Sequence, residues 1–212
     1  MYYIKKIAEM YKGQVIALKG NHEEMFLEWL KRPEEYVNFF IEDKDLITIK
    51  TFLCTEETEK IFQEINSRSN LIDISKEIAN IIKSKHKELI LWLIKLPYYF
   101  ETENQIFVHA GIEEDAEDLW KLGTPKEYFV NKYPPTTGKF IKDIIAGHIG
   151  VSNFTQNGNE IYWDGESHFY IDTIDDNNNE NKLIAVLKYN TKNKKYTSYK
   201  KNKNSWIEYE IK

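Results

Sequence analysis

Three short runs of apolar residues predict buried strands of a parallel sheet. They are residues 14–18 (Gln-Val-Ile-Ala-Leu), 105–108 (Gln-Ile-Phe-Val) and 143–146 (Asp-Ile-Ile-Ala). Continuous apolar runs of this length are typical of strands that are covered on both faces. Each run is soon followed by polar residues. We therefore expect these polar residues to cluster at the carboxyl ends of the strands, where α/β sheets place their ligand sites.

The segments between these runs carry helical patterns. Residues 1–11 keep apolar side chains on one face, which predicts the end of an amphipathic helix. A second helix is expected over residues 25–30. Residues 33–96 are largely helical, most clearly over 56–65 and 72–96. We expect the 33–96 stretch to form a helical cap or insert that shapes a pocket.

The last part of the chain predicts antiparallel strands joined by polar turns. Residues 169–172 have the composition of a strand, and residues 183–189 are expected to pair back after a polar turn at 175–181. Residues 196–200 and 206–211 are candidate edge strands. The whole pattern predicts an α/β fold.

Composition agrees with a single globular domain over residues 1–212. Hydrophobic residues make up 42% of the chain and aromatic residues 14%, which is ample for a packed core. The formal net charge of −5 offers no general attraction to nucleic acid or anionic lipid. The one cysteine, Cys54, excludes an intrachain disulfide, and neither a signal-peptide pattern nor a membrane-spanning stretch is present. We therefore expect a cytoplasmic protein with no membrane or nucleic-acid partner.

The polar residues that follow the three apolar runs have the chemistry of a divalent-metal site. Asn21, His109 and His148 offer an amide oxygen and two imidazoles. Such a set normally needs a carboxylate as well, to balance the charge and to bridge to a second ion. The sequence therefore predicts a metal site whose donor set is incomplete.

The residues around these positions carry a family resemblance. Gly20-Asn21-His22-Glu23 resembles the GNHE signature of the calcineurin-like metallophosphoesterase superfamily, which includes the PPP-type serine/threonine protein phosphatases and the symmetrical dinucleoside tetraphosphatases. Residues 107–112 resemble the second histidine strand of that family, residues 146–148 its third, and residues 170–173 the strand after it. Their order and spacing fit over nearly all of the chain.

The resemblance implies a fold, a mechanism and substrates. The fold would be a metallophosphoesterase-type β-sandwich flanked by helices. Asn21, His109 and His148 would bind one metal of a two-metal site, with Mn, Fe or Zn as the ions. Metal-bound hydroxide would attack the phosphorus directly, and His22 would bind the phosphate and protonate the leaving oxygen. The substrate would be a phosphorylated small molecule, a nucleotide such as a dinucleoside polyphosphate, or a phosphoprotein.

The chain departs from the family pattern ahead of Asn21. Two family motifs, GDxHG and GDxxDRG, have no counterpart, and no Asp or His precedes Asn21. In the family, these motifs supply the ligands of the other metal, the bridging aspartate and a phosphate-binding arginine. They lie on two strands of the sheet, and the loss of these strands would expose the edges of the neighbouring strands. We expect either a longer natural protein or a truncated, inactive paralogue that binds or regulates. We favour the first, because residues 1–11 resemble the tail of a helix already under way.

Other conspicuous residues are expected to be structural. His86 lies on a lysine-rich helical face, and His168 lies in a turn before a strand. Trp120 is expected in the core, and Asp172 is expected to be structural or to support the metal ligands. The lysines of residues 192–203 alternate with asparagine and tyrosine, which favours a solvated hairpin over a nucleic-acid surface.

Overall fold

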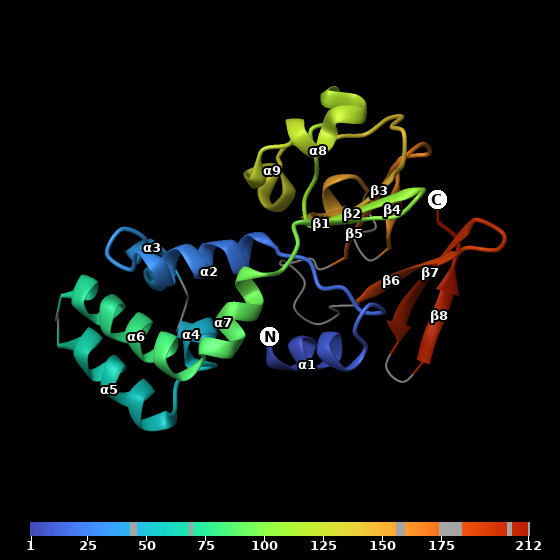
Figure 1. Cartoon of the computed structure of the whole chain (residues 1–212). Helices are drawn as coiled ribbons and strands as arrows, with labels where there is room; N and C mark the ends of the chain where they lie inside the picture. Colours follow the sequence, from blue (N-terminus) through green and yellow to red (C-terminus); the bar gives the residue numbers. More distant parts are fainter. Residues whose placement is uncertain (43–45, 68–69, 156–159, 174–183, 203–204, 212) are drawn as a thin grey trace. The chain divides into compact units, whose positions relative to one another are not determined.

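The computed structural model describes residues 1–42, 46–67, 70–155, 160–173, 184–202 and 205–211 (Figure 1). The chain divides into two compact units, Met1–Leu96 and Pro97–Lys212, and each is described by itself. In the described residues the first unit is helical, and the strands belong to the second. None of the described helices is long and apolar enough to cross a membrane.

The first unit is built from helices of very different length. They are α1 (Tyr2–Met10), α2 (Asn21–Lys31), α3 (Val37–Glu42), α4 (Ile47–Lys50), α5 (Thr55–Asn66), α6 (Leu71–Lys85) and α7 (Lys87–Ile94). The helices predicted over residues 1–11, 25–30 and 56–65 are thereby confirmed. The stretch 33–96 is helical over most of its described length, whereas its role as a cap stays a prediction.

The long helix predicted over residues 72–96 is in fact two helices that meet at His86. Its Nε2 lies 2.7 Å from the carbonyl oxygen of Phe52, and its Nδ1 lies 2.6 Å from the hydroxyl of Tyr2. The ring also meets that of Phe52 edge-on, with centroids 5.4 Å apart. His86 therefore joins three segments of the unit, whereas the sequence predicted only a position on a lysine-rich helical face.

The strand predicted over residues 14–18 is absent from the structure. Residues 15–20 belong to no helix or strand, and Ile16 is 42% exposed. An apolar run marks residues that suit a sheet interior, but a strand forms only where a neighbouring strand completes its backbone hydrogen bonds. No such ladder involves these residues in the structure, so the prediction is wrong.

A buried polar chain joins α2 to α6 in the core of the first unit. The indole N–H of Trp29 donates to Ser75 Oγ at 2.9 Å, and the Ser75 hydroxyl donates to the carbonyl of Pro33 at 2.9 Å. Trp29 and Ser75 are both fully buried. Around them Phe26 stacks on Phe52, with ring centroids 4.9 Å apart. The indole N–H of Trp29, the hydroxyl of Ser75 and the carbonyl of Pro33 are thus all hydrogen-bonded, as buried polar groups require.

The second unit contains a mixed five-stranded sheet and a three-stranded antiparallel sheet. The first has the order β1 (Tyr99–Glu101), β2 (Gln105–Val108), β3 (Asp143–Gly150), β5 (His168–Asp172), β4 (Tyr162–Trp163), and the second has the order β6 (Ala185–Asn190), β7 (Lys195–Asn202), β8 (Ser205–Tyr209). Strands β2, β3 and β5 are parallel, and β1 and β4 pair antiparallel at the edges.

The predicted strands of this unit are largely confirmed. Runs 105–108 and 143–146 are β2 and the start of β3, and run 169–172 falls in β5. The later candidates correspond to β6, β7 and β8, but their pairing differs from the prediction. Residues 183–189 were expected to pair back on residues 169–172, whereas β6 pairs with β7 in the second sheet, and the candidate edge strand 196–200 lies in β7, the central strand of that sheet. The polar turn predicted at 175–181 lies outside the described residues. The short edge strands β1 and β4 were not predicted.

The five-stranded sheet has an apolar cluster on each face. Ile144 and Ala146 of β3 pack with the cluster that includes Trp120, whereas Ile145 packs with Phe169 and with side chains of the second sheet. Short helices follow β2 and β3: η2 (Glu114–Leu119), α8 (Trp120–Gly123), α9 (Lys126–Asn131) and η3 (Val151–Asn153). The fold is thus mixed α/β with two sheets, as predicted, and Trp120 lies in the core.

Replacing Ser75 by alanine is expected to lower the free energy of unfolding by about 1–3 kcal/mol. The substitution leaves the Trp29 indole N–H and the Pro33 carbonyl buried without a partner. Ser84→Ala, at an exposed position of the same helix, is the matched control and should change it by less than about 0.5 kcal/mol. Urea unfolding measures both. Equal effects of the two substitutions would contradict the buried chain.

Candidate metal centre

The parallel ladder between β2 and β3 brings His109 and His148 together. Val108 lies opposite Ala146. His109 comes one residue after Val108 and His148 two residues after Ala146, so both lie at the same end of the paired strands. Their ring centroids are 5.2 Å apart and the rings are tilted by 53°. Both side chains are half-buried. The two imidazoles that were predicted to bind metal are therefore neighbours.

A break in the pairing of β3 with β5 sets the position of His148. Ala146 pairs with Tyr170 and Gly150 with Asp172, so the register shifts between the two pairs. His148 lies inside this irregularity with a φ of 63°. That left-handed conformation is uncommon for a residue other than glycine. Bulges redirect side chains, and backbone strain concentrates at functional sites, so both features favour a role for His148.

Asn21 and His22 lie in the first turn of α2, in the first unit. The Gly20 N–H donates to Glu23 Oε2 at 3.0 Å, so Glu23 caps the helix rather than serving the site. Asn21 is half-buried and His22 is exposed. Asn21 and His22 therefore belong to the first unit, whereas His109 and His148 belong to the second.

The second unit supplies two of the ligands that a metal site needs. His109 and His148 supply two imidazoles, which suit Mn, Fe or Zn. Among the residues that the structure describes, no three or more His, Cys, Asp or Glu side chains are grouped to hold a metal ion. Asp172 ends the neighbouring strand and is half-buried.

The sequence analysis missed a buried polar network around His168. This histidine is 2% exposed, and its Nδ1 lies 3.0 Å from Asp164 Oδ2 and 3.0 Å from the carbonyl oxygen of Gly138. Because a carbonyl only accepts, Nδ1 carries a proton. Nε2 faces Glu114 Oε1 at 3.5 Å. A residue expected in a plain turn is thus enclosed by two carboxylates.

The same network fixes the loop that leads into β3. The Gly138 N–H donates to Asp164 Oδ2 at 2.7 Å, the Phe140 N–H donates to Ser167 Oγ at 2.9 Å, and Tyr170 Oη donates to the Thr136 carbonyl at 2.5 Å. Lys132 forms an ion pair with Glu114. An Asp-Gly pair at residues 164–165 signals the turn in the sequence, but nothing local identifies these distant partners.

Comparison with protein-family models, with curated proteins and with solved structures gives no match for this chain. The resemblance to the calcineurin-like superfamily therefore rests on the strand-end motifs of the sequence.

Replacing His148 by glycine is expected to give a more stable protein than replacing it by alanine. The left-handed conformation costs a residue with a Cβ about 1–2 kcal/mol, and glycine adopts it freely. The free energy of unfolding of His148→Gly should therefore exceed that of His148→Ala by about 1 kcal/mol in urea. At His109, whose φ is not positive, the order should reverse. Glycine less stable than alanine at both positions would contradict the observed backbone.

The stability of the protein is expected to fall as the pH rises from about 6.5 through the folded-state pKa of His168. Burial lowers the pKa of His168, but Glu114 and Asp164 raise it, and the net pKa is raised. A histidine with a raised pKa stabilises the fold while protonated, so this contribution is complete below the unfolded pKa and is lost at higher pH.

Unfolding measured between pH 5.5 and 9 checks the contribution of His168. Glu114→Gln should make the free energy of unfolding fall less steeply with rising pH, because it removes a carboxylate that raises the pKa of His168. Asp115→Asn, at an exposed neighbouring position, is the matched control and should keep the wild-type profile. A Glu114→Gln profile as steep as that of the wild type would contradict the coupling.

Proposed function

We propose that this protein is a metal-dependent phosphoesterase that hydrolyses phosphomonoesters, phosphoproteins among them, or dinucleoside polyphosphates. The pairing of His109 and His148, with ring centroids 5.2 Å apart at the ends of parallel strands, carries the proposal. The left-handed backbone of His148 adds support, because such strain is retained where a side chain must point in a particular direction. The family resemblance of the surrounding motifs supplies the reaction class.

Each residue of the site would have a distinct task. His109 and His148 would hold a divalent cation, with the amide oxygen of Asn21 as a further ligand. When bound, such a cation neutralises phosphoryl charge and lowers the pKa of water. His22 is exposed at the N-terminus of α2. Helix N-termini favour phosphate, and a histidine there can give a proton to the leaving oxygen near neutral pH. A positive centre is needed locally, because the chain carries a net charge of −5.

An inactive binding or regulatory module is the alternative, and one observation favours it. The described residues contain no group of three or more His, Cys, Asp or Glu donors that could hold a metal. A protein of this kind would hold one cation weakly and would not turn over substrate.

Metal content and hydrolysis, measured together, test the proposal. The purified chain is equilibrated with Mn²⁺ or Zn²⁺, and bound metal is quantified by elemental analysis. Hydrolysis of p-nitrophenyl phosphate and of diadenosine tetraphosphate is then followed. His109→Ala and His148→Ala are expected to lose both metal and turnover. His22→Ala should lower turnover by about 10²–10⁴-fold, the usual contribution of acid–base catalysis, and keep its metal.

The outcomes separate the two functions. Bound metal with turnover that is lost in His109→Ala supports the phosphoesterase. Bound metal without turnover on either substrate supports the binding module. The absence of stoichiometric metal from the folded wild-type chain would overturn the metal centre itself, and loss of metal in His22→Ala would show that His22 has been assigned the wrong role.

A further inference from the structure

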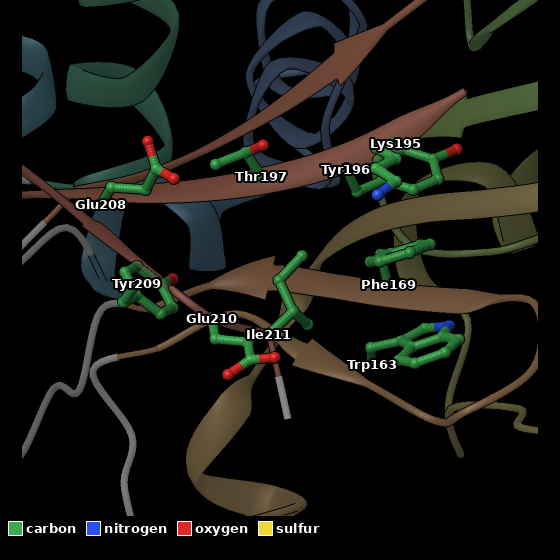
Figure 2. Close-up of a pocket in the computed structure, with 9 residues that line it drawn as sticks. All are labelled: Trp163, Phe169, Lys195, Tyr196, Thr197, Glu208, Tyr209, Glu210 and Ile211. Atoms are coloured by element: carbon green, nitrogen blue, oxygen red, sulfur yellow. The ribbon is translucent and has the colours of Figure 1, made fainter. Parts of the chain in front are cut away.

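The three-stranded sheet of the second unit has two unlike faces. Its inner face lies against the five-stranded sheet: Ser198 of β7 is fully buried, and the Tyr196 and Phe169 rings have centroids 4.5 Å apart. Side chains alternate along a strand, so the odd-numbered residues of β7 lie on the opposite face, and Figure 2 shows Thr197 pointing away from Phe169. Strand pairing extends this outer face to Lys188, Tyr199, Lys201, Trp206 and Glu208.

Two aromatic rings lie on the outer face. Trp206 is 52% exposed, and Tyr199 is half-buried, with its hydroxyl donating to Glu208 Oε2 at 2.9 Å. Tyr199 pairs with Glu208, and Trp206 lies two residues before Glu208 on β8, so the two rings are diagonal neighbours. Tryptophan and tyrosine are enriched at binding surfaces, because they combine a large apolar ring with a polar tip. The outer face therefore offers ring surface to a partner.

The outer face is also basic, in contrast to the chain as a whole. The described residues from 184 onward contain six lysines and two glutamates. Lys188, Lys195 and Lys201 are exposed on the outer face, and none of them forms an ion pair with a carboxylate in the part of the chain that the structure describes. On the inner face, by contrast, Lys200 is paired with Glu160 at 2.7 Å. The charge of the outer face is therefore left for a partner to balance.

The cations and rings of the outer face alternate along the strands. Trp206 lies directly opposite Lys201, and Lys188 Nζ lies 5.9 Å from the centre of the Tyr199 ring. From Lys195 to Lys201 the strand β7 rises about 20 Å. Phosphates of a stacked nucleic-acid strand are spaced by about 3.4 Å, so this length accommodates several nucleotides. Cations that alternate with rings suit a partner in which anions alternate with flat groups.

A purely solvated face explains these residues less well. Lysine on an edge strand such as β6 prevents aggregation, but Lys195 and Lys201 lie on the central strand β7. An exposed tryptophan does not help to keep a surface in solution. A membrane surface would need a broader apolar area than one strongly exposed ring. A nucleic-acid duplex hides the faces of its bases, so it would use the lysines and leave the rings without a partner.

We propose that the outer face binds single-stranded nucleic acid. Its phosphates contact Lys188, Lys195 and Lys201, and one base stacks on Trp206 while its neighbour lies against Tyr199. Stacking accepts every base, so the sequence preference is weak. The net charge of the whole chain gave no reason to expect such a partner, but the charge of this face has the opposite sign. The proposal does not depend on the phosphoesterase function, because the two sites share no residue.

Fluorescence anisotropy of labelled oligo(dT), titrated with the full chain, tests the outer face. A strand of about 12 nucleotides is suitable, since it exceeds the length of the face. At about 50 mM salt it should bind saturably, and the affinity should fall as salt is added. An abasic deoxyribose-phosphate strand of the same length keeps the phosphates and lacks the bases. It should bind roughly fivefold or more weakly, because it cannot stack.

Substitutions separate the ring from the charges. Trp206→Ala should weaken oligo(dT) binding roughly fivefold or more and leave binding of the abasic strand unchanged, whereas Trp206→Phe keeps a ring and should restore most of the affinity. Lys201→Gln should reduce the slope of log affinity against log salt by about 0.7, the value for one phosphate contact of a single strand. Lys126→Gln, at an exposed position of α9, is the matched control and should keep the wild-type slope.

A gain of affinity completes the test, because a misfolded variant cannot produce it. Glu208→Gln removes the negative charge of the outer face and keeps an acceptor for the Tyr199 hydroxyl, so it should bind oligo(dT) more tightly than the wild type. The proposal is overturned if oligo(dT) does not bind saturably, if the abasic strand binds equally well, or if Trp206→Ala binds like the wild type. Binding to phosphatidylserine vesicles that requires Trp206, without binding to oligo(dT), would show a membrane surface instead.

Discussion

The arrangement of the candidate site depends on the parallel pairing of β2 with β3. Parallel strands end at the same edge of a sheet, so residues that follow them in sequence are neighbours in space. The Gly147 N–H extends this pairing past the strand end by donating to the His109 carbonyl at 2.9 Å. The backbone of one histidine position is thereby tied to the residue that precedes the other. This ladder therefore brings together His109, which follows β2, and His148, which lies in the second half of β3.

Buried strands could be predicted from the sequence because burial on both faces leaves a continuous apolar run. Residues 105–108 and 143–146 carry this pattern and form β2 and the start of β3. Residues 14–18 carry the same pattern and form no strand. The difference lies in pairing, which is a property of neighbouring strands and not of the run itself. The edge strands β1 and β4 are too short to leave any pattern.

The candidate site could also be predicted only in part. The sequence places His109 and His148 after two apolar runs, and the histidines meet because these runs form neighbouring strands. It does not contain the register shift at His148, which arises from pairing with β5. The network around His168 was missed because Glu114 and Gly138 approach it only through the fold. A histidine at the start of a strand looks the same in sequence whether its ring is solvated or enclosed.

Two of the three histidines of the second unit, His168 and His148, occupy positions that are costly for different reasons. His168 is buried, and its cost is offset by carboxylates that favour its protonated form and by backbone groups that hold the loop before β3. Those contacts make it a structural residue. His148 has a half-buried ring and a left-handed backbone conformation that glycine would adopt at a lower cost. Stability therefore accounts for His168, whereas the strained backbone at His148 favours a functional role for its imidazole.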